Sequence, residues 1–207
     1  MNNIKKYNLV SLILTLNLIL FVTILFIFPS NMPWVDDWQW IENLQIHDKN
    51  YFLWLIKLEN IHNHLTVKLL LTFSKLFLNF NFEFFNYLSI LIIFTSSLII
   101  SIKLINNNYS IYFVLLIIMM LFTGKQFPSI SQMANIAWLI TFLLIIIFWY
   151  HLNINRLSFF MIISIILAPL TIGMGILIPI YIFLTTLFVN YKIKYKFIYI
   201  FFHHYQL

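Results

Sequence analysis

The sequence predicts an all-α membrane protein: a bundle of about six transmembrane helices, with an outer-face loop that carries an interfacial amphipathic helix. Three observations lead to this class. Hydrophobic residues make up 62% of the 207 residues and charged residues only 9%, far below the roughly 25% typical of soluble domains. Charge-free apolar runs recur along the chain. All six acidic residues fall within residues 29–83. We therefore treat residues 1–207 as a single integral membrane domain.

The formal charge of +6 and the absence of cysteine narrow the classes of partner. No basic patch or RNA-binding motif accompanies the excess of cations, so we expect no nucleic-acid partner. The cations are better explained as topology signals, because lysine and arginine concentrate in cytoplasmic loops. A chain without cysteine forms neither a disulfide nor a thiolate metal site.

The first apolar run, residues 7–28, is long enough to cross a bilayer. Its 22 residues carry no charge and would form a helix of about 33 Å at 1.5 Å per residue. Lys5 and Lys6 precede it, which predicts a cytoplasmic amino terminus. A cleaved signal peptide is the alternative. We favour the uncleaved span, because the run is too long and no small-x-small cleavage site follows Phe28.

Residues 29–83 form the predicted outer loop. They hold every acidic residue and four of the six tryptophans, and tryptophan favours the boundary between membrane and water. The loop ends in "LTVKLLLTFSKLFLNF", residues 65–80, which predicts a helix of about 24 Å. Lysines inside a bilayer are costly, so we expect this helix to lie flat in the interface. Its polar residues recur at spacings of four, three and four, as one helical stripe does; they are Lys68, Thr72, Lys75 and Asn79.

The remaining spans are predicted within residues 84–190. Residues 157–190 are too long for one crossing, and a proline followed by two glycines divides them, namely Pro169, Gly173 and Gly175. We expect the glycines only to permit this turn. The other predicted spans are residues 84–102, 111–123 and 136–150.

The charges between these spans predict the orientation. Lys103 and Arg156 follow two of the spans, and three lysines lie in the basic tail, residues 191–207. Placing these cations in the cytoplasm with the amino terminus agrees with six spans. The tail ends in "FIYIFFHHYQL", which looks like a seventh apolar segment that stops early.

The order of these features resembles the GT-C superfamily of membrane glycosyltransferases, which use lipid-phosphate sugars and include the protein mannosyltransferases and the bacterial lipid A aminoarabinose transferases. "DDW" follows the first span, and "ENIHNHL" occupies residues 59–65. Uncharacterised bacterial members commonly carry Asp-Asp-Trp and then Asn-Glu-His-Arg. The segments "FPSISQMANIAWLITF" (127–142) and "APLTIGMGILIPIYIF" (168–183) are similar to their Gln-x-x-Asn-x-x-Trp and small-x-Gly-x-Leu segments.

The resemblance implies a glycosyltransferase in the bacterial inner membrane, surrounded by lipid, that moves a sugar from a polyprenyl-phosphate donor to an acceptor at the outer face. It implies that Asp36 or Asp37 is the general base, and we favour Asp36. Either carboxylate can instead hold a divalent cation, Mg²⁺ or Mn²⁺, against the donor phosphate. The chain departs from the pattern at residues 62–65, where the glutamate and the arginine are missing. Members of the superfamily also usually have more spans, so we expect a truncated or degenerate relative.

Asp36 and Asp37 also have an ordinary structural explanation. Acidic residues are common in outer loops, and Asp37 can cap a short helix over residues 38–44. Glu59, His62 and His64 at the end of the loop are candidates for binding the substrate. Two histidines at i and i+2 do not share a helix face, so we do not expect a two-histidine metal site on one helix. One of them can orient a phosphate or complete a site with Asp36, or all three can be surface residues.

Three further candidates for binding the substrate lie in or after the second outer loop. Lys125 is a cation that can meet the donor phosphate, although a lone lysine in a loop is more often solvated. Gln132 and Asn135 stand at the outer end of the next span. A substrate role for these two competes equally with a helix cap or interhelical hydrogen bonds.

A non-catalytic membrane protein, such as a carrier or a flippase component, is the alternative from another class, and an inactive fragment is a third. A carrier should show ionisable residues inside its spans, or paired broken helices at mid-membrane. The predicted spans hold almost no ionisable residue. The polar chemistry instead concentrates at one outer face, which favours an enzyme that works at the interface.

Overall fold

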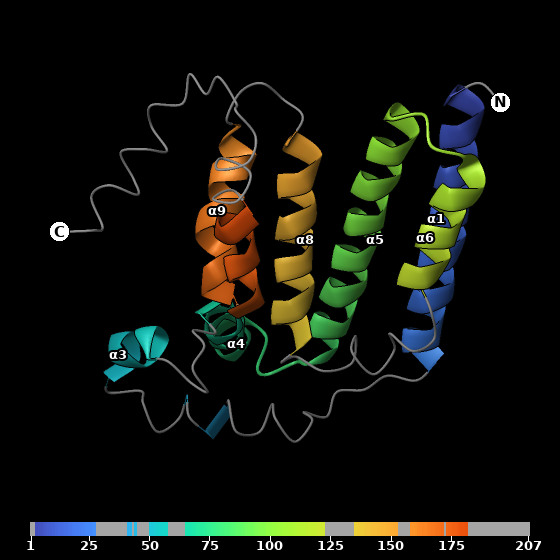
Figure 1. Ribbon diagram of the computed structural model, residues 1–207. Helices are drawn as coiled ribbons and strands as arrows, with labels where there is room; N and C mark the ends of the chain where they lie inside the picture. The colour runs from blue at the N-terminus through green and yellow to red at the C-terminus, as the bar shows by residue number, and fades with distance from the viewer. Residues whose placement is uncertain are drawn as a thin grey trace.

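The computed structural model describes residues 3–27, 41–42, 44, 50–57, 65–122, 135–152, 158–171 and 173–181. The elements assigned in this part of the chain are helices, as the sequence predicts, and Figure 1 shows their arrangement. In chain order they are α1 Asn3–Ile27, α3 Tyr51–Ile56, α4 Leu65–Phe77, α5 Glu83–Asn106, α6 Ile111–Leu121, α8 Ile136–His151, α9 Phe159–Thr171 and the 3-10 helix η4 Gly173–Ile176.

Two of the described helices, α1 and α5, are long and apolar enough to cross a membrane. They have 25 and 24 residues, which corresponds to about 36 Å at 1.5 Å per residue. α1 begins at Asn3, before the predicted run of residues 7–28, because lysine is a good helix former and the helix continues through Lys5 and Lys6. These two helices give weak support for an integral membrane protein by length and composition.

The other apolar helices are shorter. α6 has 11 residues, α8 has 16 and α9 has 13, and a spanning helix needs about 20. Within the predicted spans 111–123 and 136–150, the chain is helical over Ile111–Leu121 and over Ile136–His151 up to residue 150. That the whole chain crosses the membrane six times stays a prediction.

α5 is the central helix of the bundle. It packs on α1 and α6 on one side and on α8 on the other, and α9 packs on α8. Small buried side chains let neighbouring helices approach closely, and α5 buries four serines. Two of these satisfy their hydroxyls within α5: Ser97 Oγ donates to the Ile93 carbonyl at 2.8 Å and Ser101 Oγ donates to the Ser97 carbonyl at 2.7 Å. The four are Ser89, Ser96, Ser97 and Ser101.

The break predicted within residues 157–190 is confirmed. α9 runs through Pro169 and ends two residues later at Thr171, and η4 then begins at Gly173. Thr171 Oγ1 donates to the Ala168 carbonyl at 2.7 Å, which satisfies an acceptor in the last turn. A Cβ on Gly175 would lie 1.8 Å from the same carbonyl oxygen. Gly175 is therefore needed for the close approach of η4 to α9.

Polar contacts tie several helix ends together at one end of the bundle. Lys6 Nζ donates to the Tyr109 carbonyl at 3.3 Å, and the Tyr7 hydroxyl donates to Asn106 Oδ1. Lys103 Nζ donates to the Tyr150 carbonyl at 2.6 Å. We call this end the Lys103 end, and the opposite end, where α3 and α4 lie, the α4 end (Figure 1). Lys6 and Lys103, both predicted to be cytoplasmic, thus lie at the same end.

Candidate functional site

α4 crosses the α4 end of the bundle. It contacts α8 and α9, and Figure 1 shows it nearly end-on beneath them, so its axis runs across theirs. The predicted helix of residues 65–80 is confirmed from Leu65 to Phe77. It ends earlier because Asn79 and Phe80 adopt positive φ angles of 49° and 58°, a left-handed conformation that terminates helices. Asn79 consequently lies beyond the helix and is not part of its stripe.

Within the polar stripe of α4, Lys68 and Thr72 face α3 rather than water. Lys68 is fully buried, with 0% of its surface exposed. Thr72 is half-buried, and its Oγ1 donates to the Lys68 carbonyl at 2.8 Å. The exposed side chains of α4 are instead apolar. Periodicity correctly groups the stripe, but it does not reveal which neighbour covers that side.

α3 is the element that covers Lys68. Lys68 Nζ donates to the carbonyls of Trp54 and Lys57, each at 2.7 Å. It also lies 5.3 Å from the centroid of the Trp54 ring, a distance at which a cation is attracted to the ring face. These carbonyls are at the carboxyl end of α3, where the helix dipole is negative. A buried ammonium needs such partners, because an unpaired buried charge is very costly.

A second polar contact joins the same two helices. The Tyr51 hydroxyl donates to Thr72 Oγ1 at 3.0 Å, one turn along α4 from Lys68. Trp54 is 1% exposed, and its ring lies 5.9 Å from that of Tyr51. This role of Lys68 and Trp54 was not predicted from the sequence. The sequence signal that could have indicated it is the spacing of four between Lys68 and Thr72, together with the short aromatic segment Tyr51–Ile56.

An apolar cluster under α3 and α4 joins distant parts of the chain at the α4 end. It unites residues before α3, both short helices, and the beginnings of α5 and α8. We call it the α4-end cluster; its buried members are Ile41, Leu44, Trp54, Leu55, Val67, Leu71, Phe82, Phe85, Ile92, Ile136 and Ala137.

Most predicted site residues lie outside the described residues: Asp36, Asp37, Glu59, His62, His64, Lys125 and Gln132. Several described neighbours of these candidates belong to the α4-end cluster. Ile41 follows the aspartates and Leu55 precedes Glu59, while Leu65, packed against the cluster, follows His64 directly. Phe122, the described residue before Lys125, packs elsewhere, with its ring 5.5 Å from that of Phe21 on α1.

Asn135 is the one candidate for which the structure describes a position. It precedes α8 at the α4 end, is half-buried, and has helical φ and ψ angles of −75° and −12°. Its side chain makes no capping hydrogen bond to α8. The helix-cap explanation for Asn135 is therefore wrong. Its neighbour Ile136 is fully buried in the α4-end cluster.

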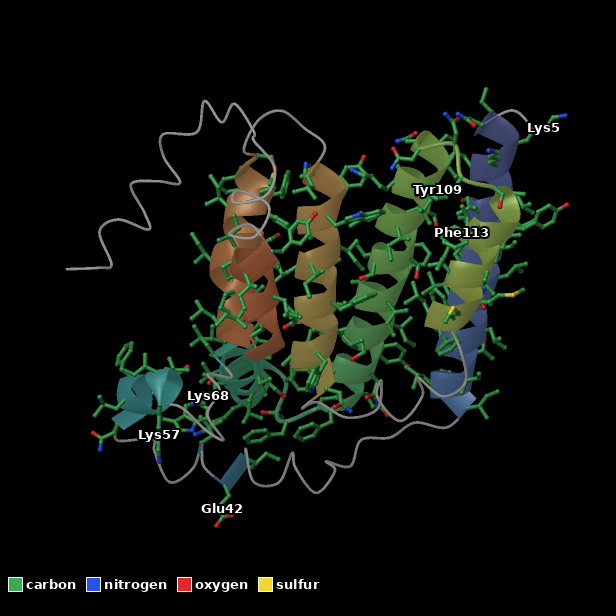
Figure 2. All side chains as sticks on the ribbon, in the orientation of Figure 1. Lys5, Glu42, Lys57, Lys68, Tyr109 and Phe113 are labelled. Carbon is green, nitrogen blue, oxygen red and sulfur yellow. The ribbon has the colours of Figure 1, made fainter. Side chains whose placement is uncertain are left out.

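The described residues do not by themselves form a metal site. Among them no three histidine, aspartate or glutamate side chains gather closely enough to hold an ion. Asp36 and Asp37, the expected ligands of Mg²⁺ or Mn²⁺, fall outside this part of the chain. Glu42, the described acidic residue nearest to them in sequence, is exposed and points away from the bundle (Figure 2).

Comparisons with protein-family models, with curated proteins and with solved structures found no match to this chain. The resemblance to the GT-C superfamily therefore rests on the short motifs of the sequence.

Proposed function

We propose that this protein is a GT-C-like glycosyltransferase that moves a sugar from a polyprenyl-phosphate donor to an acceptor at the membrane surface of the α4 end. The observation that supports this proposal is the α4-end cluster, because it gathers described neighbours of candidates from three separate stretches of sequence. A reaction centre needs such convergence, since its acid–base and binding groups must meet within hydrogen-bond reach.

The length of chain between each candidate and its described neighbour limits how far the candidate can lie from the α4-end cluster. Ile41 is five residues after Asp36, and five residues of chain reach at most about 18 Å. Ile136 is four residues after Gln132, and Leu65 adjoins His64. We therefore propose that the aspartates, the loop-end histidines and Gln132 act with Asn135 in one site at the α4 end. Phe122, the last described residue before Lys125, belongs to the separate cluster of α1, α5 and α6. We therefore assign Lys125 a smaller role in binding the donor.

The proposed chemistry uses one of the two aspartates as the general base, with Asp36 favoured. The acceptor hydroxyl attacks the anomeric carbon and gives its proton to the carboxylate. The bond between that carbon and the phosphate oxygen breaks, and the lipid phosphate leaves with the bonding electrons. The donor's tail stays in lipid, so this chemistry belongs at the interface. In this proposal the interface lies at the level of the amphipathic helix α4, which crosses the end of the bundle.

A transfer assay tests the proposal. Membranes containing the protein are incubated with labelled polyprenyl-phosphate sugars, and transfer is compared for the wild type, Asp36→Asn and Asp37→Asn. We expect one of these variants to lose transfer by at least about 100-fold, the usual contribution of a general base. Glu42→Gln is the matched control, because it removes an exposed carboxylate from the same segment. Absence of transfer by the wild type, or wild-type rates in both variants, contradicts the proposal and favours the non-catalytic alternative.

A further inference from the structure

The outer surface of α3 and α4 is apolar. On α4 the exposed large side chains recur at spacings of four, three and one, so they share one side of the helix; they are Leu69, Phe73, Leu76 and Phe77, with 48%, 41%, 67% and 70% of their surface exposed. On α3 the exposed apolar residues are Phe52, Leu53 and Ile56, with 80%, 65% and 65% exposed. A soluble monomer rarely exposes so much contiguous apolar surface without a partner.

Two polar side chains of α4 are used in its contact with α3. Lys68 and Thr72 of α4 bond to α3, to the carbonyls of Trp54 and Lys57 and to the hydroxyl of Tyr51. The contact thus removes from the surface a lysine that would interrupt the apolar side. It also holds the short α3, whose six residues are too few to form a stable helix alone.

Two charged side chains near α3 and α4 point away from the bundle (Figure 2). Glu42 and Lys57 are exposed, and Figure 2 shows both pointing away from the bundle. On its other side, α4 contacts α9, whose own exposed residues are apolar, among them Ile162, Ile166 and Leu167. The exposed apolar residues of α3 and α4 thus lie on a pair of helices that adjoins α9 through α4, and the exposed residues of α9 are also apolar, while the charged Glu42 and Lys57 point away from the bundle. A membrane interface has this same order, from hydrocarbon to headgroups to water.

We propose that α3 and α4 form one lipid-contacting unit, which we call the α3–α4 unit, and that Lys68 is its positioning residue. The partner is the lipid of one leaflet, in which the apolar residues of both helices lie at the boundary of headgroups and acyl chains. Lys68 fixes α3 on α4 by pairing with the carboxyl end of α3 and the Trp54 ring. This inference does not depend on glycosyl transfer.

Spin labels test the lipid contact directly, because the chain has no native cysteine. Phe52→Cys and Phe77→Cys report the apolar side, and Glu42→Cys and Lys57→Cys are matched controls at the charged edge. Each labelled chain is placed in phospholipid vesicles, and collisions with oxygen and with a water-soluble nickel chelate are measured. We expect the ratio of oxygen to nickel collisions to be several-fold higher at positions 52 and 77. Water-like ratios at 52 and 77 overturn the proposal. Shielding from both reagents does so too, because it shows that a protein, such as a second copy, covers the surface.

Lys68→Met tests the positioning role in the Phe52→Cys and Phe77→Cys chains. We expect the label at 52 to become mobile and water-accessible while the label at 77 on α4 keeps its lipid-like ratio. Lys68→Arg retains a cation and should restore part of the order at 52. An unchanged spectrum at 52 in Lys68→Met removes Lys68 from the proposal. Should that variant fail to fold, Trp54→Leu keeps both carbonyls but deletes the ring. It should loosen position 52 to a smaller extent, and no loosening there has the same meaning.

Discussion

The two ends of the bundle use the same contact, a buried lysine at the carboxyl end of a neighbouring helix. At the α4 end, Lys68 Nζ bonds to carbonyls of α3 and lies 5.3 Å from the centroid of the Trp54 ring. At the Lys103 end, Lys103 Nζ bonds to a carbonyl in the last turn of α8 and lies 5.4 Å from the centroid of the Trp149 ring. Both ammonium groups therefore meet the negative end of a helix dipole and the face of an indole.

The two lysines differ in what they hold together. Lys68 is 0% exposed, has two carbonyl acceptors and joins residues 11 and 14 positions apart. Lys103 is 8% exposed, bonds to one carbonyl and joins residues 47 positions apart. The first secures a short helix that has little stability of its own, whereas the second joins α5 to α8, two helices that already pack on each other. The same contact should consequently matter more at the α4 end.

The largest expected effect is a difference in cysteine labelling between the two ends of the bundle, which we predict to lie on opposite sides of the membrane. In Glu42→Cys the thiol should react with an impermeant reagent in intact cells, because the charge bias places the α4 end outside. In Lys5→Cys the thiol should react only after permeabilisation, since Lys5 lies at the Lys103 end (Figure 2). The chain without added cysteine is the blank. Labelling of position 5 in intact cells would reverse the orientation, and equal labelling of both positions would place both ends on one side.

The next effect is on stability at the α4 end. Lys68→Met should lower the free energy of unfolding by about 3 kcal/mol, because two buried carbonyls lose their charged donor. Thermal unfolding in detergent, followed by circular dichroism, measures the change. Lys57→Met is the control, since the Lys57 side chain is exposed and its substitution should stay within about 0.5 kcal/mol. Equal losses of unfolding free energy in the two variants would mean that the buried contacts of Lys68 do not stabilise the protein.

Lys103→Met should have a smaller effect, about 1–2 kcal/mol in the same assay, because one carbonyl loses its donor and packing between α5 and α8 remains. Lys103→Arg should retain most of the stability, because it keeps a cation near the rings of Trp149 and Tyr150, each centred 5.4 Å from Lys103 Nζ. A loss in Lys103→Met larger than in Lys68→Met would contradict the proposed difference between the ends. The register of α5 and α8 would then depend on this one contact.

Most of the helices could be predicted from the sequence because long apolar runs leave few alternatives. α1 and α5 follow their runs and extend them through flanking polar residues, Lys5 and Lys6 in one case and Lys103 in the other. Pro169 marked the break in residues 157–190, although the helix continues for two more residues. These features depend on local chemistry, which a sequence displays directly.

Tertiary contacts were not predictable in the same way. The stripe of α4 is a correct periodicity, but its burial depends on α3, which lacks a periodic pattern long enough to predict it. The need for Gly175 arises from the Ala168 carbonyl of another element. For the candidate site, the sequence contains short motifs around Asp36, Asp37 and His64. The structure adds that described neighbours of several candidates converge in the α4-end cluster, which no local motif contains.

The smallest expected effect concerns how helices begin at the Lys103 end. Ser110 precedes α6 with extended backbone angles, φ −65° and ψ 144°, and its Oγ accepts a hydrogen bond from the Phe113 N–H at 3.3 Å. Ser158 makes the equivalent contact before α9, where its Oγ accepts from the Met161 N–H at 3.2 Å. The first N–H groups of a helix have no partner within it, so each serine satisfies one of them.

Ser110→Ala should therefore destabilise the protein by about 1 kcal/mol, at the lower side of the usual range because the 3.3 Å bond is long. Ser110→Thr keeps an acceptor at the same place and is the matched control, with little expected loss. Ser158→Ala should cost a similar amount, because the geometry is nearly the same. The size of this effect relative to that of Lys103→Met shows which contact stabilises the Lys103 end. If Ser110→Ala lowered the stability as much as Lys103→Met, the start of α6 would hold the Lys103 end together. The bond from Lys6 to the Tyr109 carbonyl, one residue before Ser110, would then be the contact to remove next.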